Sequence, residues 1–427
     1  MSCLICDNDN TIGSQFCTKC GTSLSASTTS HVLVIKDNSI RYHGIDALRG
    51  IAMLLGIVLH AAIPYMPNIE EFWPTDENSS HIINTIFHFI HIWRMPLFFI
   101  LTGFFANLII SKKSWKSWWK NRLLRIVLPV IVFSPLMSLT LPWIFNYGRI
   151  GEFIFFYTDE GQPFHLWFLW HLIIFVIVTA IFRPMYLLGI RSLDSLNTMG
   201  LGVVSSVFYK SKSILSVIIF RSKFPIVFIT FCCFINLPMQ GDIILNPIAS
   251  GLYFTIGYSL FRNESLFMFL KTYWRYYFLA GLICFILFMI LESRNPANIY
   301  SVNLNDKQHI STILEPFTFI KVFIEVTCAI LFSYAFIGLA EKRFGSYNTK
   351  KRFISDGAYW MYLIHLPIVT LITFSMFNLG IPIEIKFLIS ILITSMICLV
   401  TYKYFVRSTP IGILLNGKRH TFKIRKL

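Results

Sequence analysis

The sequence predicts an all-α polytopic membrane protein, with about ten transmembrane helices and a small N-terminal zinc-ribbon head. The chain of 427 residues is 55% hydrophobic and has a mean hydropathy of +0.63. Only 14% of its residues are charged. These charges lie between apolar runs of roughly 20 residues, the length that a bilayer-spanning helix needs. Two Cys-x-x-Cys pairs precede the first apolar run and predict the head.

Composition divides the chain into four segments. Residues 1–24 are the predicted zinc ribbon, and 25–40 are a Ser/Thr-rich linker. Residues 41–410 hold the apolar runs and form the transmembrane domain, and 411–427 are a basic tail. The chain begins with about 45 polar residues rather than with the apolar h-region of a signal peptide, so no cleaved signal peptide is expected.

The head has the spacing of a tetrahedral zinc site. In "CLICDNDNTIGSQFCTKCG", Cys3 and Cys6 form one pair and Cys17 and Cys20 the other. Four thiolates in this arrangement predict a closed structural zinc. Two disulfides or a redox pair are the alternatives, which a cytosolic position disfavours. No catalysis is expected here.

Ten apolar runs are predicted to be spanning helices, at 46–66, 85–110, 123–143, 164–182, 224–239, 243–261, 276–292, 316–340, 355–377 and 385–405. The stretch 183–223 is only moderately apolar and contains Lys210 and Lys212, so we expect a loop with a surface-lying helix there. An even number of spans places both termini on one side of the membrane.

The distribution of basic residues predicts the orientation. Of the 37 Lys and Arg residues, 31 fall in the termini and in the loops on the same side as the termini. The positive-inside rule therefore places both termini in the cytoplasm, with the chain in the inner membrane of a bacterium. The net charge of +16 is then a topology signal and a phosphate-facing surface, and no nucleic-acid partner is expected.

The first apolar run carries two polar side chains that share one face. In "DALRGIAMLLGIVLH", residues 46–60, the eleven-residue step from Arg49 to His60 advances about 1100° on a helix, only ~20° from whole turns, and rises ~16 Å. Gly56 lies between them and leaves room. A mid-membrane histidine is costly and usually functional, although a structural hydrogen bond is the alternative.

A second candidate site opens the third run, "WKSWWKNRLLRIVLP". Arg122 and Arg125 are three residues apart and so share a helical face near the cytoplasmic edge. Two guanidinium groups suit a multiply charged phosphate ligand. Anchoring to the inner leaflet, beside three tryptophans, is an equal alternative.

Four further residues are candidates for the acceptor side or for support. Arg94 follows two histidines in the outer half of the second run, and His165 and Trp167 lie at the outer mouth of the fourth. His365 lies near the middle of the ninth. Such aromatic-rich mouths suit a carbohydrate ligand, because a tryptophan face stacks on apolar sugar faces. They equally resemble the aromatic belt of a membrane protein.

Together these residues resemble the acyltransferase-3 family of membrane O-acyltransferases. Its arginine-ten-residues-histidine motif is matched at Arg49 and His60, and its RxxR motif at Arg122 and Arg125. The stretch "FFILTGFF" is similar to its FFxLSGF segment, with threonine for serine. "RMPLFFILTGFF", "FHLWFLWHL", "YWMYLIHLPIV" and "STPIGILLNGKR" resemble the glucan biosynthesis protein C-like branch, which is associated with succinylation of periplasmic glucans. The zinc head is an addition to that pattern.

The resemblance implies a donor, an acceptor and roles for the motif residues. The donor is cytoplasmic acyl-CoA, held by Arg49, Arg122 and Arg125, and the acceptor is a hydroxyl of an extracytoplasmic glycan. His60 lies between them as the general base. Direct transfer is favoured, and a covalent acyl-enzyme intermediate is the alternative. The alternatives are a transporter or flippase for a lipid-linked sugar, and a zinc-headed membrane sensor.

Overall fold

The computed structural model describes residues 42–70, 72–112, 115–154, 164–198, 226–236, 246–261, 263–294 and 307–416, with isolated positions between 203 and 211. Within these residues all regular secondary structure is helical. The predicted zinc ribbon with its four cysteines, the linker and the basic tail beyond residue 416 lie outside the described residues.

In chain order the helices are α1 (His43–Ala62), η1 (Ile63–Tyr65), α2 (His81–Lys112), α3 (Trp115–Arg122), η2 (Leu123–Val127), α4 (Leu128–Ile150), η3 (Phe164–Leu166), α5 (Trp167–Thr198), α7 (Ile226–Asn236), α8 (Pro247–Leu260), α9 (Glu264–Ser293), α11 (Lys307–Phe344), α12 (Thr349–Phe374), α13 (Ile383–Thr401), η6 (Tyr402–Val406) and α14 (Pro410–Asn416). The short elements η1 and η3 are 3₁₀ turns, whereas η2 and η6 are π-helical.

Asparagine side chains begin three of these helices. Asn246, Asn263 and Asn348 precede α8, α9 and α12, and each side-chain oxygen accepts a hydrogen bond from a backbone N–H of the first turn. This satisfies donors that have no partner within the helix. The helix starts are therefore encoded locally, next to the apolar runs.

Seven of the described helices are long and apolar enough to cross a membrane, so the chain is a multi-pass membrane protein. The predicted runs 164–182, 224–239 and 243–261 correspond to the apolar part of α5 and to α7 and α8, which are shorter. The described residues therefore do not confirm the predicted count of ten.

The loop predicted for 183–223 is wrong at its beginning. Helix α5 continues without interruption to Thr198, with Pro184 inside it. At 1.5 Å per residue its 32 residues reach about 48 Å, which exceeds the ~30 Å apolar core of a bilayer. Hydropathy indicates where the apolar layer ends, which is near residue 182. The helix itself continues beyond that point through more polar residues.

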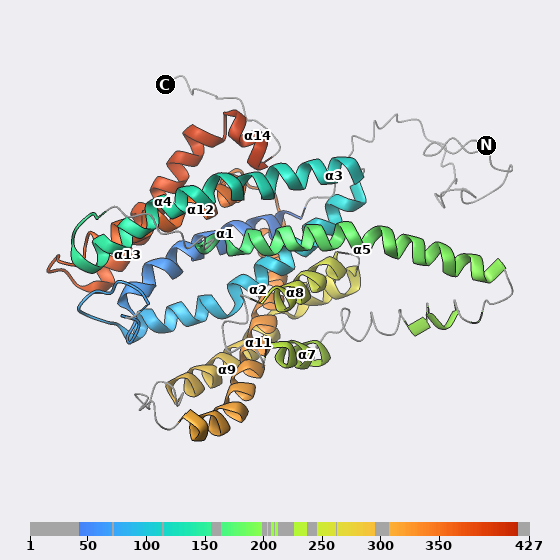
Figure 1. Cartoon of the computed structure of the whole chain (residues 1–427), viewed down its shortest axis with the longest axis horizontal. Coiled ribbons are helices and arrows are strands. Elements are labelled where there is room, and N and C mark those ends of the chain that lie inside the picture. Colours follow the sequence, from blue (N-terminus) through green and yellow to red (C-terminus); the bar gives the residue numbers. More distant parts are fainter. Residues whose placement is uncertain are drawn as a thin grey trace. The chain divides into compact units, whose positions relative to one another are not determined.

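Helix α1 lies at the centre of the bundle, where it packs against α12, α2 and α11 (Figure 1). In α1, α2, α11 and α12, 61% of the most apolar window is buried, compared with 22% in α4 and α9. The exposed apolar side chains of α4 and α9 are what a lipid-facing surface requires. The candidate residues of α1 are therefore inside the protein and away from lipid.

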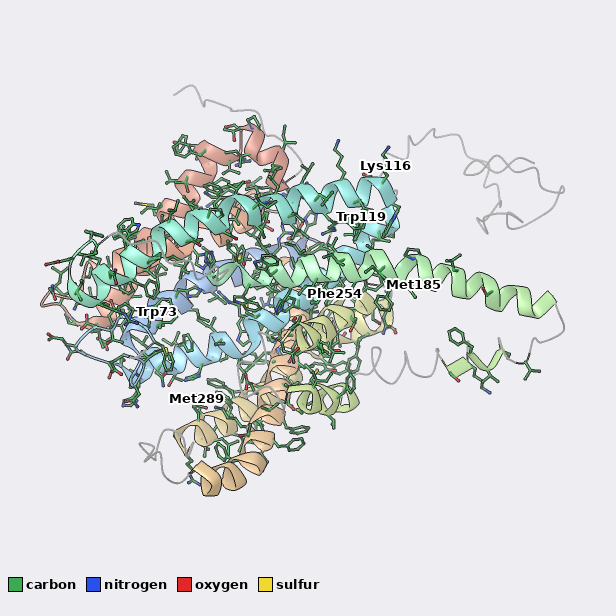
Figure 2. All side chains as sticks on the ribbon, in the orientation of Figure 1. Trp73, Lys116, Trp119, Met185, Phe254 and Met289 are labelled. Carbon is green, nitrogen blue, oxygen red and sulfur yellow. The ribbon has the colours of Figure 1, made fainter. Side chains whose placement is uncertain are left out.

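Contacts between distant segments bring several of the basic segments to one end of the bundle. The backbone N–H of Ile45 donates to Oε1 of Glu341 at 2.8 Å, so the end of α11 caps the start of α1. The Tyr359 hydroxyl donates to the carbonyl of Arg125 at 2.5 Å, which joins the first half of α12 to η2. The segments 111–125 and 341–352, predicted to be cytoplasmic, thus share one end. Figure 2 shows Lys116 at this end and Trp73 at the opposite end.

Candidate active site

A cavity of about 270 Å³ lies between α1, α2, α4, α5 and α12. Five of the predicted residues line it together: His60, Arg94, His165, Trp167 and His365. They come from four different segments, as far apart as 305 positions in the chain. The other lining residues are aromatic or aliphatic, except for His91. The structure therefore brings several histidines and one arginine together in an otherwise apolar cavity wall, which is typical of a ligand site.

Hydrogen bonds determine which ring nitrogens of two histidines carry a proton. Nδ1 of His365 lies 2.9 Å from the carbonyl oxygen of Tyr362 and 3.0 Å from that of Met361, and Nε2 of His165 lies 2.9 Å from the same Tyr362 oxygen. A carbonyl only accepts, so both nitrogens must donate. In the neutral rings, Nε2 of His365 and Nδ1 of His165 are then lone-pair acceptors. Both are buried and have no hydrogen-bond partner.

His60 completes this group of three imidazoles. Its ring centroid lies 5.2 Å from that of His365, which in turn lies 5.1 Å from that of His165. Nδ1 of His60 is also buried without a hydrogen-bond partner. The cavity thus presents several unsatisfied ring nitrogens, at least two of them acceptors, and a substrate hydroxyl could donate to one of them.

Arg94 crosses the face of α1 at Gly56. A Cβ atom at position 56 would overlap Nη1 of Arg94 and would lie 3.8 Å from Nε2 of His365. The space that the sequence predicts at Gly56 is therefore filled by this guanidinium group. Arg94 and His365 both lie two residues before a proline inside their helix, Pro96 and Pro367. Such prolines remove a backbone donor and bend helices, which sets the direction of nearby side chains.

Sequence reasoning missed Trp73, in the loop between α1 and α2. Its indole lies nearly parallel to the His60 ring, with centroids 6.5 Å apart, and its edge meets Phe145 at 4.6 Å. Trp73 lines the cavity, and its ring nitrogen is buried without a hydrogen-bond partner.

A buried ion pair holds this loop in place. Nζ of Lys386 lies 2.7 Å from Oδ2 of Asp76 and also donates to the carbonyl of Phe377 at 2.8 Å. The side chains of Lys386 and Asp76 are 3% and 1% exposed. Lys386 lies in the first turn of α13, inside the predicted run 385–405. The sequence signal for the ion pair is a lysine at the start of an apolar run, because a buried lysine needs an acidic partner.

Removing one member of this pair should destabilise the protein strongly. We expect Lys386→Met to lower the free energy of unfolding by about 3–5 kcal/mol, because it leaves the Asp76 carboxylate buried and unpaired. Thermal unfolding of the purified protein in detergent measures this.

The matched control is Lys321→Met, which breaks the Lys321–Glu292 pair, whose side chains are 24% and 21% exposed. There the expected loss is at most about 1 kcal/mol. The double variant Lys386→Met/Asp76→Leu should recover much of the stability. Equal losses at Lys386 and Lys321 would contradict a loop held by a buried pair.

Arg49 and His60 face the same neighbouring helix. Nη2 of Arg49 donates to the carbonyl of Ser355 at 3.2 Å, and the ring of His60 packs against that of His365. Both residues of the shared face therefore contact α12. Arg49 also lies 3.5 Å from Asp46 and stacks over Phe105, at 5.3 Å. The predicted shared face of α1 is confirmed by these contacts.

The two arginines of the third run have different surroundings. Arg125 lies in the π-helical turn η2, and its carbonyl is bonded to Tyr359, one turn along α12 from the Ser355 that binds Arg49. Arg122 lies over the Trp118 ring at 5.8 Å and lines a small cavity of about 30 Å³ between α2, α5 and α8. Its Nε and Nη2 atoms are buried without hydrogen-bond partners.

Within the described residues, no group of three or more His, Cys, Asp or Glu side chains is arranged to hold a metal ion. A further histidine, His171 in α5, is bonded through Nδ1 to Oγ of Ser250 at 2.8 Å. This contact explains its burial without a ligand.

Residues 42–403 match the acyltransferase-3 family model, which is described as an acyltransferase domain. The chain belongs to this acyltransferase family. The match includes all the described helices that line the cavity, and it confirms the family that the motifs predict. The protein is therefore a multi-pass membrane protein of an acyltransferase family.

Curated relatives match a shorter part of this acyltransferase. Glucans biosynthesis protein C of Escherichia coli (strain K12) is 33% identical over 100 residues, which are 23% of this chain and 25% of that protein. The protein of the same name from Shigella dysenteriae serotype 1 (strain Sd197) is 32% identical over the same lengths. The alignment thus spans a quarter of these relatives. No solved structure matches.

Proposed function

We propose that this acyltransferase moves an acyl group, succinyl or acetyl, from cytoplasmic acyl-CoA to a hydroxyl of an extracytoplasmic glycan such as a periplasmic glucan. The observation that carries the proposal is the cavity lined by α1, α2, α5 and α12, where imidazole nitrogens without hydrogen-bond partners lie beside the guanidinium group of Arg94. Acyl transfer from a thioester to a hydroxyl needs a proton acceptor at the hydroxyl and a donor at the carbonyl oxygen. The cavity has both: imidazole nitrogens that can accept the proton, and the Arg94 guanidinium that can donate to the carbonyl oxygen.

The reaction follows from these groups. His60 takes the proton of the acceptor hydroxyl as its oxygen attacks the thioester carbonyl carbon. The new carbon–oxygen bond forms, the carbon–sulfur bond breaks, and the imidazolium returns its proton to the leaving sulfur of CoA. His365 adjoins His60 and is the next candidate for the base. No covalent enzyme intermediate is needed.

The donor would enter from the end at which the basic segments meet. Arg49, Arg122 and Arg125 would bind its phosphates, and the ~16 Å rise from Arg49 to His60 is comparable to the reach of a pantetheine arm. The orientation with both termini in the cytoplasm, in a bacterial inner membrane, is part of this proposal. It rests on the concentration of basic residues in the segments on that side.

The acceptor class rests on a different observation. The relatives are named for glucan biosynthesis, and the cavity has two indoles, Trp73 and Trp167, in its wall. Indole faces suit the apolar faces of sugar rings, and the buried N–H of Trp73 could donate to a sugar oxygen.

The direct test uses the purified full-length protein in lipid nanodiscs. Release of CoA thiol from acetyl-CoA or succinyl-CoA is followed with and without a linear glucan oligosaccharide, and the glucan is examined by mass spectrometry. We expect thiol release that depends on the glucan and a product heavier by one acyl group. Binding of the glucan without any thioester cleavage would contradict the proposal and favour a transporter.

The third run yields a prediction about the donor. Arg125→Ala should raise the KM for acyl-CoA by about 10-fold or more, because a charge-assisted hydrogen bond contributes ~1.5–3 kcal/mol to binding. The control is Lys116→Ala, at an exposed position of α3. Equal, small effects of both substitutions would show that Arg125 contributes only general charge, as a leaflet anchor does.

The predicted zinc ribbon also becomes a proposal. We expect one zinc ion per chain in the full-length protein, and loss of that zinc in a Cys3→Ser/Cys6→Ser variant, because half of the thiolate ligands are gone. Metal analysis of the purified protein measures this. Transfer activity should persist without residues 1–40, since none of the proposed chemistry involves them. Loss of activity in a truncated protein that still folds would show that the head belongs to the enzyme.

A further inference from the structure

Arg94 is a partly buried cation that lines the cavity. Its Nε has no hydrogen-bond partner, and its Nη2 bonds to the weak acceptor Sδ of Met95 at 3.6 Å. None of the described residues that line the cavity is Asp or Glu. In contrast, Arg352 lies 2.6 Å from Asp356. A guanidinium group with a buried, unpaired N–H in an apolar wall is costly, so we expect a ligand to supply an acceptor or negative charge there.

Arg94 lies in α2, and the point at which its side chain contacts α1 indicates which part of a ligand it would bind. Nη1 lies against Gly56, one helical turn before His60 on the same face, and Nε2 of His365 is close to the same point. A donor group and a lone-pair acceptor are thus side by side. A reacting pair needs this combination, because the carbonyl oxygen accepts while the attacking hydroxyl donates.

We propose that Arg94 binds the carbonyl oxygen of the thioester and stabilises the oxyanion that forms there. This inference rests on the proposed function. As the hydroxyl oxygen bonds to the carbonyl carbon, the carbonyl π electrons move onto its oxygen, and the guanidinium N–H groups donate to that charge. When the carbon–sulfur bond breaks, the charge leaves with the sulfur and the carbonyl re-forms. Arg94 gains and loses no proton in this sequence.

The first test compares kcat and KM in the full-length enzyme with two donors, acetyl-CoA and succinyl-CoA. We expect Arg94→Met to lower kcat by about 10²–10³-fold with both donors and to change the KM for acyl-CoA little, because the contact strengthens only in the transition state. Arg94→Lys should restore part of kcat, since a point charge replaces the fork of donors.

A second variant keeps the arginine and moves it. Gly56→Ala places a methyl group where Nη1 lies, and the displaced atom is the end of a flexible side chain, so the protein should fold. We expect kcat to fall by about 10-fold or more with unchanged KM, because a displaced donor loses transition-state contact. The control is Gly251→Ala in α8, where the added Cβ would lie at an ordinary 3.4 Å from the ring of Phe175.

The outcomes separate this inference from the proposed function. If the wild-type protein cleaves neither thioester, the proposed function fails, and the inference fails with it. If the wild type transfers acyl groups and folded Arg94→Met keeps a normal kcat, only the role of Arg94 is overturned. A rise in KM for succinyl-CoA alone, with acetyl-CoA unaffected, would also overturn it, because Arg94 would then bind the carboxylate of the acyl group.

Discussion

His60→Asn should abolish acyl transfer, with a loss in kcat of about 10²–10⁴-fold, the contribution typical of a general base. An amide can replace a hydrogen bond of the imidazole but cannot take up a proton at neutral pH. Binding of acyl-CoA should stay nearly intact, because the proposed phosphate site is at the Arg49 end of α1 and not at His60. Steady-state kinetics and equilibrium binding of CoA to the same preparations measure the two effects separately.

The matched control is His171→Asn, in the same bundle but bonded to Ser250. Its amide can keep that bond, so turnover should change little. If folded His60→Asn transfers acyl groups at a near-normal rate, His60 is a packing residue. His365→Asn would then be the decisive variant, since Nε2 of His365 is the neighbouring acceptor.

Arg49→Ala should reduce kcat and raise the KM for acyl-CoA together, with a loss in kcat/KM of about 10–100-fold. A charge-assisted hydrogen bond contributes ~1.5–3 kcal/mol, and each 1.36 kcal/mol changes a rate tenfold. The turnover falls as well, because a donor held less firmly places its thioester less precisely near His60. Arg49→Lys should recover binding better than turnover, since lysine keeps the charge but not the planar fork.

The control for Arg49 is Arg275→Ala, which removes an exposed basic residue on the side predicted to be cytoplasmic. We expect no more than a small effect at moderate salt, because exposed charges are screened. If Arg275→Ala and Arg49→Ala lower kcat/KM equally, the basic surface attracts acyl-CoA only by its total charge. The contacts of Arg49 with Ser355 and Asp46 would then serve stability alone.

Several features could be predicted because they depend on residues close together in the chain. The helical class follows from apolar runs of bilayer length, and the shared face of Arg49 and His60 follows from helical periodicity within α1. Gly56 was expected to leave space, and the structure fills that space with Arg94. The ends of helices were less predictable, as α5 shows. Hydropathy indicates only which residues lie in the apolar layer, whereas a helix can continue beyond that layer wherever its residues favour helix.

The helical class, the family and the individual candidate residues could be predicted from the sequence, since they depend on local pattern and motif spacing. That His60, His165 and His365 lie together is visible only in the folded chain, because contacts between α1, η3 and α12 join distant residues and do not affect the periodicity of any one helix. The tertiary structure also assigned the proton-bearing nitrogens of His165 and His365 through the carbonyl of Tyr362. Finally, it joined Asp76 to Lys386, 310 positions away, because two buried charges are tolerated inside an apolar bundle only when they meet.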